Sequence, residues 1–231
     1  MKRCIFCGST TNTYERKEHI VPESLGGKGI LPEGLVCDNC NNYFGREFEK
    51  ETLDFEDIRF SRALEHIFSK RGRTPVANAK NVAIYSDRNT KPIKISSSQM
   101  TKTVYGKGSI HIEFPQSKLG PLLRLLLKIG LEYFAMQQAD DIFKQKFNKA
   151  KKVVRCPARG CKWPLAIKKG YGGSSKLYSH KFHRIHENDS VIFEFSHWLT
   201  CYLISLDDGY FEKFRLEIDD SEYNVLNVGI L

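Results

Sequence analysis

The chain has 231 residues, of which 41% are hydrophobic and 27% are charged, a composition typical of a globular protein with one or two domains. Its most apolar stretch, 122–136, is too short to span a bilayer, and no signal peptide precedes Cys4, so we expect a cytoplasmic protein without a membrane partner. The formal net charge of +9 is concentrated in two basic blocks, 59–107 and 144–184, which favours nucleic acid as a partner over a merely solvated basic face.

The first four cysteines form two pairs with identical spacing. Two residues separate Cys4 from Cys7, and two separate Cys37 from Cys40. Cytoplasmic thiols stay reduced, and four thiolates from two such pairs suit a closed tetrahedral zinc site. We therefore predict structural Zn²⁺ on these four cysteines rather than four unrelated thiols.

The residues between and after the cysteine pairs predict a ββα unit. A short strand is expected over 18–22, a glycine turn at 26–27, and a returning strand over 30–36. A helix is then expected over 42–53, with Asn41 in its N-cap region, where asparagine is favoured. Zinc would fasten the two ends of this unit together.

Three short motifs in this unit occur together. The sequence reads Glu-His-Ile-Val-Pro at 18–22, Leu-Gly-Gly at 25–27 and Val-Cys-Asp-Asn-Cys-Asn-Asn at 36–42. With the first cysteine pair, this pattern resembles the HNH (His-Me finger, ββα-metal) endonuclease family, in the branch whose finger is braced by four cysteines. The resemblance covers about the first 52 residues.

The resemblance assigns roles to particular residues. It implies that His19 is the general base that activates water, because a neutral imidazole accepts a proton near neutral pH. It implies Glu18 and Asn41 as ligands of a catalytic Mg²⁺ or Mn²⁺, with Asn42 as the alternative ligand.

The sequence departs from the family pattern in three ways. The residue before the histidine is Glu18 rather than the commoner aspartate, and Asn41 replaces the family's last histidine. The family's middle asparagine is absent, because Pro, Glu and Gly occupy positions 32–34. What supports the histidine loop is therefore left open by the sequence.

Further basic residues follow the finger. A helix is expected over 54–70, and a Gly- and Pro-containing linker over 71–75. We accordingly divide the chain into a finger at 1–53, a helix and linker at 54–75, and a larger domain at 76–231. Basic side chains near the finger are expected to bind phosphates beside the cut: Arg59, Arg62, Lys70, Arg71 and Arg73.

The larger domain is expected to contain strands around one long helix. Strands are predicted at 82–85, 93–95, 110–114, 177–186, 191–195, 199–206 and 210–218. The helix is predicted over 117–152 and should be largely buried, with one polar stripe made by Arg124, Lys128 and Glu132. Its basic end suits either a helix C-terminus or a phosphate backbone, through Lys149, Lys151 and Lys152.

A second zinc site is the less favoured interpretation of the later cysteines. Cys156 and Cys161 are separated by four residues, and three histidines follow at 180, 183 and 186. This spacing is not a specific zinc signature, so ordinary thiols are the favoured interpretation.

The sequence thus predicts an α+β protein: a zinc-braced ββα-metal finger, then a larger α+β domain with an antiparallel sheet and one long buried helix. The expected function is metal-dependent endonuclease cleavage of DNA, with RNA left open. The larger domain would grip nucleic acid or regulate cutting, and the resemblance implies a role in prokaryotic defence or a mobile element. The alternatives are a non-catalytic zinc-ribbon binding module and an effector nuclease activated by a partner. A regulatory protein or a homodimer remains open.

Overall fold

The computed structural model of the protein describes most of the chain outside the segment that precedes the longest helix. The described residues are 2–68, 72, 76–79, 82–85, 94–97, 119–169, 177–185, 190–197, 200–207, 211–219 and 221–230. The predicted strand at 110–114 and the first two residues of the helix predicted over 117–152 lie outside these residues.

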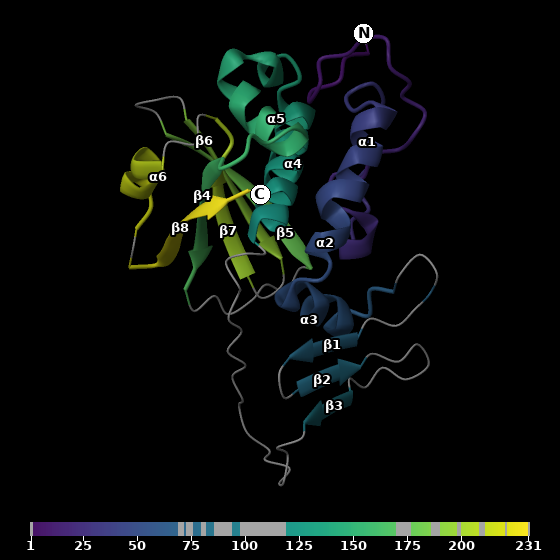
Figure 1. Ribbon diagram of the computed structural model, residues 1–231, viewed down its shortest axis with the longest axis vertical. Coiled ribbons are helices and arrows are strands. Elements are labelled where there is room, and N and C mark those ends of the chain that lie inside the picture. The colour runs from purple at the N-terminus through teal and green to yellow at the C-terminus, as the bar shows by residue number, and fades with distance from the viewer. Residues whose placement is uncertain are drawn as a thin grey trace.

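Short helices and a small sheet make up the N-terminal part. The helical elements are η1 (Glu23–Leu25), α1 (Asp38–Phe44), the π-helical turn η2 (Gly45–Glu49), α2 (Lys50–Thr52) and α3 (Glu56–Leu64). The strands are β1 (Val76–Ala79), β2 (Val82–Tyr85) and β3 (Lys94–Ser97). They pair antiparallel in that order and lie below α3 in Figure 1.

The remaining elements form a helical layer and a five-stranded antiparallel sheet. The helical layer contains α4 (Leu119–Gln137), η4 (Asp141–Phe143), η5 (Gln145–Phe147) and α5 (Asn148–Arg155). Helix α6 (Phe211–Glu217) packs on the opposite face of the sheet (Figure 1). The strands are β4 (Lys162–Lys168), β5 (Tyr178–Ile185), β6 (Ser190–His197), β7 (Thr200–Ser205) and β8 (Tyr223–Gly229). The strand order is β5-β6-β7-β4-β8, which confirms the predicted α+β fold class.

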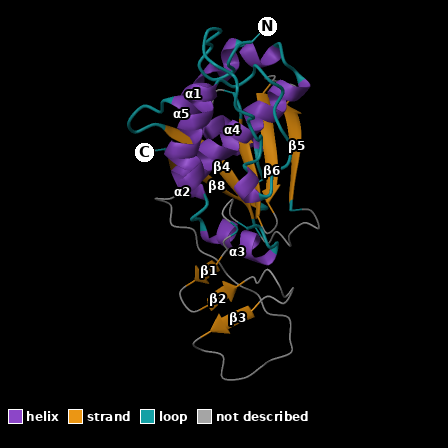
Figure 2. Cartoon of the chain, turned by 90° about the vertical axis from the view of Figure 1, so that its right-hand side faces the viewer, coloured by secondary structure: helices purple, strands orange, loops and turns teal. Residues whose placement is uncertain are grey.

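Helix α4 lies between the sheet and the N-terminal helices. Figure 1 shows it with the sheet on one side and α1 and α2 on the other, and Figure 2 shows α4 and α5 in front of the strands. A β-carbon on Gly130 would lie 2.7 Å from Leu206 Cδ2 and 2.8 Å from Phe193 Cδ1. Glycine at this position therefore allows the helix to approach the sheet closely.

One hydrophobic cluster connects the finger to the sheet. It contains Phe44 and Phe48 beside the cysteines, Leu125 of α4, and Phe193 and Val228 of the sheet. The division of the chain at residues 53 and 75 stays a prediction, and the cluster joins described residues of the finger to those of α4 and the sheet.

The local structure of the finger differs from the predicted ββα pattern. The strands predicted at 18–22 and 30–36 are reduced to one isolated antiparallel bridge between His19 and Ile30. Pro22 and Pro32 follow closely and lack the N–H that would extend the ladder. The helix begins at Asp38 rather than 42, with Cys37 at its N-cap, so Asn41 lies inside the first helical turns.

Two other sequence predictions were wrong in the larger part of the chain. The helix predicted over 117–152 is divided at Gln137, where the polar run 137–141 offers no large apolar side chain to bury before Ile142. Residues 211–217 form α6 instead of a strand, because the apolar residues at 211, 214 and 218 follow helical spacing. Strands β1, β4 and β8 were missed.

Candidate active site

Four cysteine sulfurs converge at one end of the finger. The Sγ atoms of Cys4, Cys7, Cys37 and Cys40 all lie within 4.8 Å of one another, and Cys7 Sγ is 3.7 Å from Cys37 Sγ. In a tetrahedral zinc site with Zn–S bonds near 2.3 Å, neighbouring sulfurs are about 3.8 Å apart. The four thiols therefore fit structural zinc, as the sequence predicted.

The chemistry of the four thiols also favours a cation at their centre. Burial raises the pKa of the Cys7 thiol to about 11, while the hydrogen bond from Cys40 lowers the pKa of Cys4 to about 5. Four neighbouring thiolates repel one another, and a bound cation allows them all to ionise. Asn12 Nδ2 adds a hydrogen bond of 3.3 Å to Cys37 Sγ, a contact that the sequence did not reveal.

Asp38 fastens the segment before His19 to the start of α1. Its carboxylate accepts hydrogen bonds from the backbone N–H of Arg16 at 2.9 Å and of Glu15 at 3.2 Å. The Thr13 side chain and these amides lower the pKa of Asp38. Nothing in the sequence indicated this contact, because Asp38 belongs to no motif other than the second cysteine pair.

His19 projects from the bridge onto the outer face of the finger. The Ile20 N–H donates to the Gly29 carbonyl at 3.1 Å, and the Leu31 N–H donates to the Glu18 carbonyl at 2.8 Å. Glu18 and Ile20 are both buried, whereas His19 is half-buried and its bridge partner Ile30 is 47% exposed. Because successive side chains of an extended segment point to opposite faces, the imidazole lies on the accessible side.

Asn41 joins the helix to the histidine segment. Its Nδ2 donates to the Lys17 carbonyl at 3.4 Å, and its side chain is half-buried. Asn41 therefore lies beside the residues that precede His19, with its Oδ1 as the atom available to a metal. Asn42 is exposed on the next position of the helix.

The Glu18 carboxylate is bound by an ammonium group of helix α4, which packs on the finger. Glu18 Oε1 forms an ion pair with Lys128 Nζ of α4, and both side chains are buried. Burial raises the pKa of Glu18, and the charge of Lys128 works against this shift. The polar stripe that the sequence showed on α4 thus faces the finger.

Arg124 and Glu132 complete this polar stripe. Arg124 Nη2 donates to the Tyr43 hydroxyl at 2.8 Å and to the Val154 carbonyl at 2.9 Å. Glu132 is fully buried, and its Oε2 lies 3.3 Å from Lys128 Nζ.

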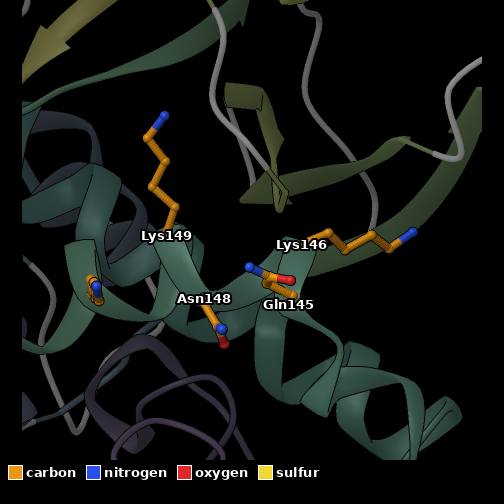
Figure 3. A pocket seen from close by; sticks show the side chains of 5 residues that line it. Gln145, Lys146, Asn148 and Lys149 are labelled. Carbon is orange, nitrogen blue, oxygen red and sulfur yellow. The ribbon is translucent and has the colours of Figure 1, made fainter.

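The basic residues expected to contact nucleic acid are exposed lysines on α5, one buried lysine on α5, and residues near α3. Lys149 and Lys152 are exposed on α5, and they line an open hollow of ≈ 560 Å³ together with Gln145, Lys146 and Asn148. Figure 3 shows Lys146 and Lys149 extending away from each other on either side of this hollow. Lys151 is buried and donates to the Ile142 carbonyl, so we no longer expect it to contact nucleic acid.

The basic residues near α3 are only partly described. Arg59 pairs with Asp54 at 2.8 Å, and Arg62 is half-buried. Lys70, Arg71 and Arg73 lie outside the described residues.

The structure does not assemble a second zinc site from the described later residues. His183 pairs with Glu194 at 2.8 Å, and His180 stacks on Tyr133 with ring centroids 3.7 Å apart. Among the residues that the structure describes, the four N-terminal cysteines are the one cluster arranged to hold a metal ion. The ordinary-thiol interpretation of Cys156 and Cys161 stays a prediction.

Comparison with known proteins identifies the finger. Residues 4–54 match the family model described as HNH endonuclease, which confirms the resemblance for this segment and supports a nuclease-type function. No curated protein and no solved structure matches the chain. Within the described residues, no helix is long and apolar enough to cross a membrane.

Proposed function

From the HNH-type finger at residues 4–54, we propose that the protein is a metal-dependent endonuclease that hydrolyses phosphodiester bonds in DNA. The observation that carries this proposal is the accessible imidazole of His19 within a cysteine-braced frame. Asn41 lies beside the same segment, bonded to the carbonyl of Lys17. A non-catalytic zinc-ribbon module would not need either side chain at these places.

His19 is the proposed general base. Its ring nitrogen takes a proton from water as the water oxygen bonds to phosphorus, and the bond from phosphorus to the 3′ oxygen breaks. The departing 3′ oxygen takes a proton from solvent, so the products are a 3′-hydroxyl and a 5′-phosphate. When bound, a divalent Mg²⁺ or Mn²⁺ would neutralise charge that develops during this cleavage.

Glu18 and Asn41 are the proposed ligands of this ion. Because Glu18 Oε1 is bound by Lys128, Oε2 is the oxygen that would contact the metal. Asn41 donates through Nδ2, which leaves Oδ1 as its ligand atom. One carboxylate, one amide oxygen, waters and substrate phosphate together provide the oxygen set that Mg²⁺ prefers. Asn42 is the alternative if the helix register differs by one residue.

The proposed nucleic-acid surface includes the hollow on α5. Lysines 149 and 152 would bind the backbone electrostatically, with Arg59 and Arg62 as further contacts. Such contacts do not distinguish DNA from RNA, so RNA is the alternative substrate. A role in prokaryotic defence or in a mobile element stays a proposal, as does activation by a protein partner or a second copy of the chain.

The proposal is tested by nicking of supercoiled plasmid with purified protein in Mg²⁺, Mn²⁺ or EDTA. We expect nicking in the presence of either ion, no nicking in EDTA, and a loss of at least about 100-fold in His19→Ala, consistent with removal of a general base. Zinc content should be unchanged in that variant, because His19 is not among the sulfur ligands.

His180→Ala is the matched control. It removes another accessible histidine, on β5, and should cleave like the wild-type protein. If His19→Ala retains wild-type cleavage, His19 is not the base. If neither DNA nor RNA is cut by the wild-type protein while nucleic acid is bound, the zinc-ribbon binding module replaces the nuclease.

A further inference from the structure

A buried ammonium group holds the backbone of the proposed catalytic residue. Lys128 Nζ donates to the His19 carbonyl at 2.8 Å and lies 3.3 Å from the Ile20 carbonyl. The lysine comes from α4, 109 residues after His19 in the chain. It lies far beyond the segment that matches the HNH family.

The same ammonium collects three carboxylates. It pairs with Glu18 Oε1, lies 3.4 Å from Glu49 Oε1 and lies 3.3 Å from Glu132 Oε2. Four of its five oxygen neighbours therefore belong to the finger, and one belongs to its own helix. The side chain of Lys128 is 0% exposed.

This arrangement explains why a lysine is found on a leucine-rich helix. Burying an unpaired ammonium is strongly unfavourable, so the group stays charged only where oxygen atoms replace its water. Five oxygen atoms lie around Lys128 Nζ, three of them from carboxylates, and they replace the water that surrounds an exposed ammonium. The main partners of the ammonium are therefore the residues around His19.

We propose that Lys128 is a positioning residue for the His19 segment: it fixes the His19 carbonyl and one oxygen of Glu18 from the α4 side. This inference rests on the proposed nuclease function for its catalytic meaning, although the positioning contact itself does not. The backbone of the His19 segment is thereby held from the buried side, where the Glu18 carboxylate lies, while the imidazole lies on the accessible face.

Lys128 also answers a question that the sequence leaves open. The asparagine expected before the third cysteine is missing, and Glu33 at that place forms an exposed ion pair with Lys2 instead. Support for the His19 segment therefore comes from Asp38 before it and from Lys128 beneath it. Groups that orient metal ligands typically change affinity or activity about 10- to 100-fold when removed.

The test compares two substitutions with a matched control. Lys128→Met keeps the length of the side chain but removes its charge and hydrogen bonds. Lys128→Met/Glu132→Gln also removes one buried carboxylate, so that it folds with fewer unpaired charges. Arg124→Met is the control, because Arg124 is a buried cation one turn earlier on α4 that contacts Tyr43 and Val154 rather than the His19 segment.

The first readout is amide hydrogen exchange, which requires neither metal nor activity. We expect the Ile20 and Leu31 amides, which bond across the bridge, to exchange at least about 10-fold faster in both Lys128 variants, because local opening controls exchange. The Asn41 amide, bonded to the Cys37 carbonyl, should keep its wild-type rate, and so should all three amides in Arg124→Met. Zinc content is measured in parallel to establish that each finger is folded.

The second readout is cleavage as a function of Mn²⁺ concentration. We expect kcat to fall about 10- to 100-fold, or half-saturation to need about 10-fold more Mn²⁺, in the double variant. Lys128→Arg should recover part of the loss, because it keeps the charge. A purely structural contribution would change thermal stability without changing this metal dependence.

The outcomes separate this inference from the nuclease proposal. If the zinc-loaded double variant keeps wild-type exchange at Ile20 and Leu31, Lys128 does not position the segment and the inference is overturned. A wild-type kcat together with wild-type Mn²⁺ dependence in that variant would overturn it equally. If the wild-type protein cuts no nucleic acid, the nuclease proposal fails, and exchange at these two amides still decides whether Lys128 holds the segment.

Discussion

At the scale of single residues, the turn that connects His19 to its bridge partner Ile30 depends on glycine. A β-carbon on Gly27 would lie 1.8 Å from the Val21 carbonyl oxygen, a backbone atom that cannot rotate away. Gly26 precedes it with φ of 83°, in the left-handed region that favours glycine. The pair therefore brings residues 21 and 27 together and returns the chain toward Ile30.

Gly27→Ala should consequently destabilise the finger. Relief of the overlap requires a backbone shift, and such overpacking typically costs about 1–3 kcal/mol in the free energy of unfolding. Thermal melting monitored by circular dichroism would measure this loss. Gly29→Ala is the control, since no heavy atom lies within 4 Å of its added β-carbon. Equal melting temperatures for the two variants would contradict this account of the turn.

At the scale of elements, α5 presents different chemistry on its two sides. Lys149 and Lys152 are exposed and line the hollow in Figure 3, whereas Lys151 is buried against the Ile142 carbonyl. Arg155, at the end of α5, lies over the Tyr43 ring at 4.2 Å from its centroid. The helix therefore packs on the finger while keeping two lysines at the surface.

Lys149→Ala/Lys152→Ala should weaken DNA binding and its salt dependence. Each phosphate that a lysine no longer neutralises reduces the slope of log K against log salt by about 0.9, so the double substitution should reduce it by about 1.8. Fluorescence anisotropy with a labelled duplex, over a series of salt concentrations, would measure the slope. The control is Lys162→Ala/Lys168→Ala on β4, and an unchanged slope for the α5 pair would remove this helix from the interface.

Sequence reasoning succeeded for the cysteine cluster and for the family resemblance because the evidence for both is local. Two cysteine spacings and one histidine motif lie within 40 residues, whereas the role of His19 stays a prediction. It failed where the deciding contacts are distant. The stripe of Arg124, Lys128 and Glu132 was visible, but its partners are residues such as Glu18 and Tyr43, which no spacing on α4 could indicate.

Errors in individual elements have similar causes. The aromatic residues of 210–218 favour a strand by propensity. The segment forms α6 instead, because its helical spacing allows Phe214 to be buried against the sheet. In β4, Pro164 and flanking lysines hid a strand that lies between β7 and β8 in the sheet.

At the scale of the whole molecule, the finger and the sheet share one hydrophobic cluster. Cys40 and Phe44 belong to it, and so does Trp163 of β4, whose Nε1 donates to the Ser205 carbonyl at 3.0 Å. Helix α4 contacts both sides. Loss of structure in the finger should therefore lower the thermal stability of the sheet.

Zinc removal should lower the melting temperature reported by Trp163. The chain has two tryptophans, so Trp198→Phe makes Trp163 the sole fluorescent reporter. Chelation by a thiol-compatible zinc chelator should lower this transition by several degrees, because about 1 kcal/mol corresponds to roughly 2–4 °C for a chain of this size. Restoration by added Zn²⁺ is the control. If the melting temperature reported by Trp163 stays the same after chelation, the finger and the sheet unfold independently.

The position of Lys128 limits which segments of this protein could be transferred to another chain by recombination. The recognisable motif ends near residue 54, yet the counter-charge for its buried acids lies on α4. A recombination event that moved residues 4–54 alone would carry Glu18 and Glu49 into a new chain without their cation. The cation that balances the buried acids of the finger is therefore inherited only when α4 is inherited with it.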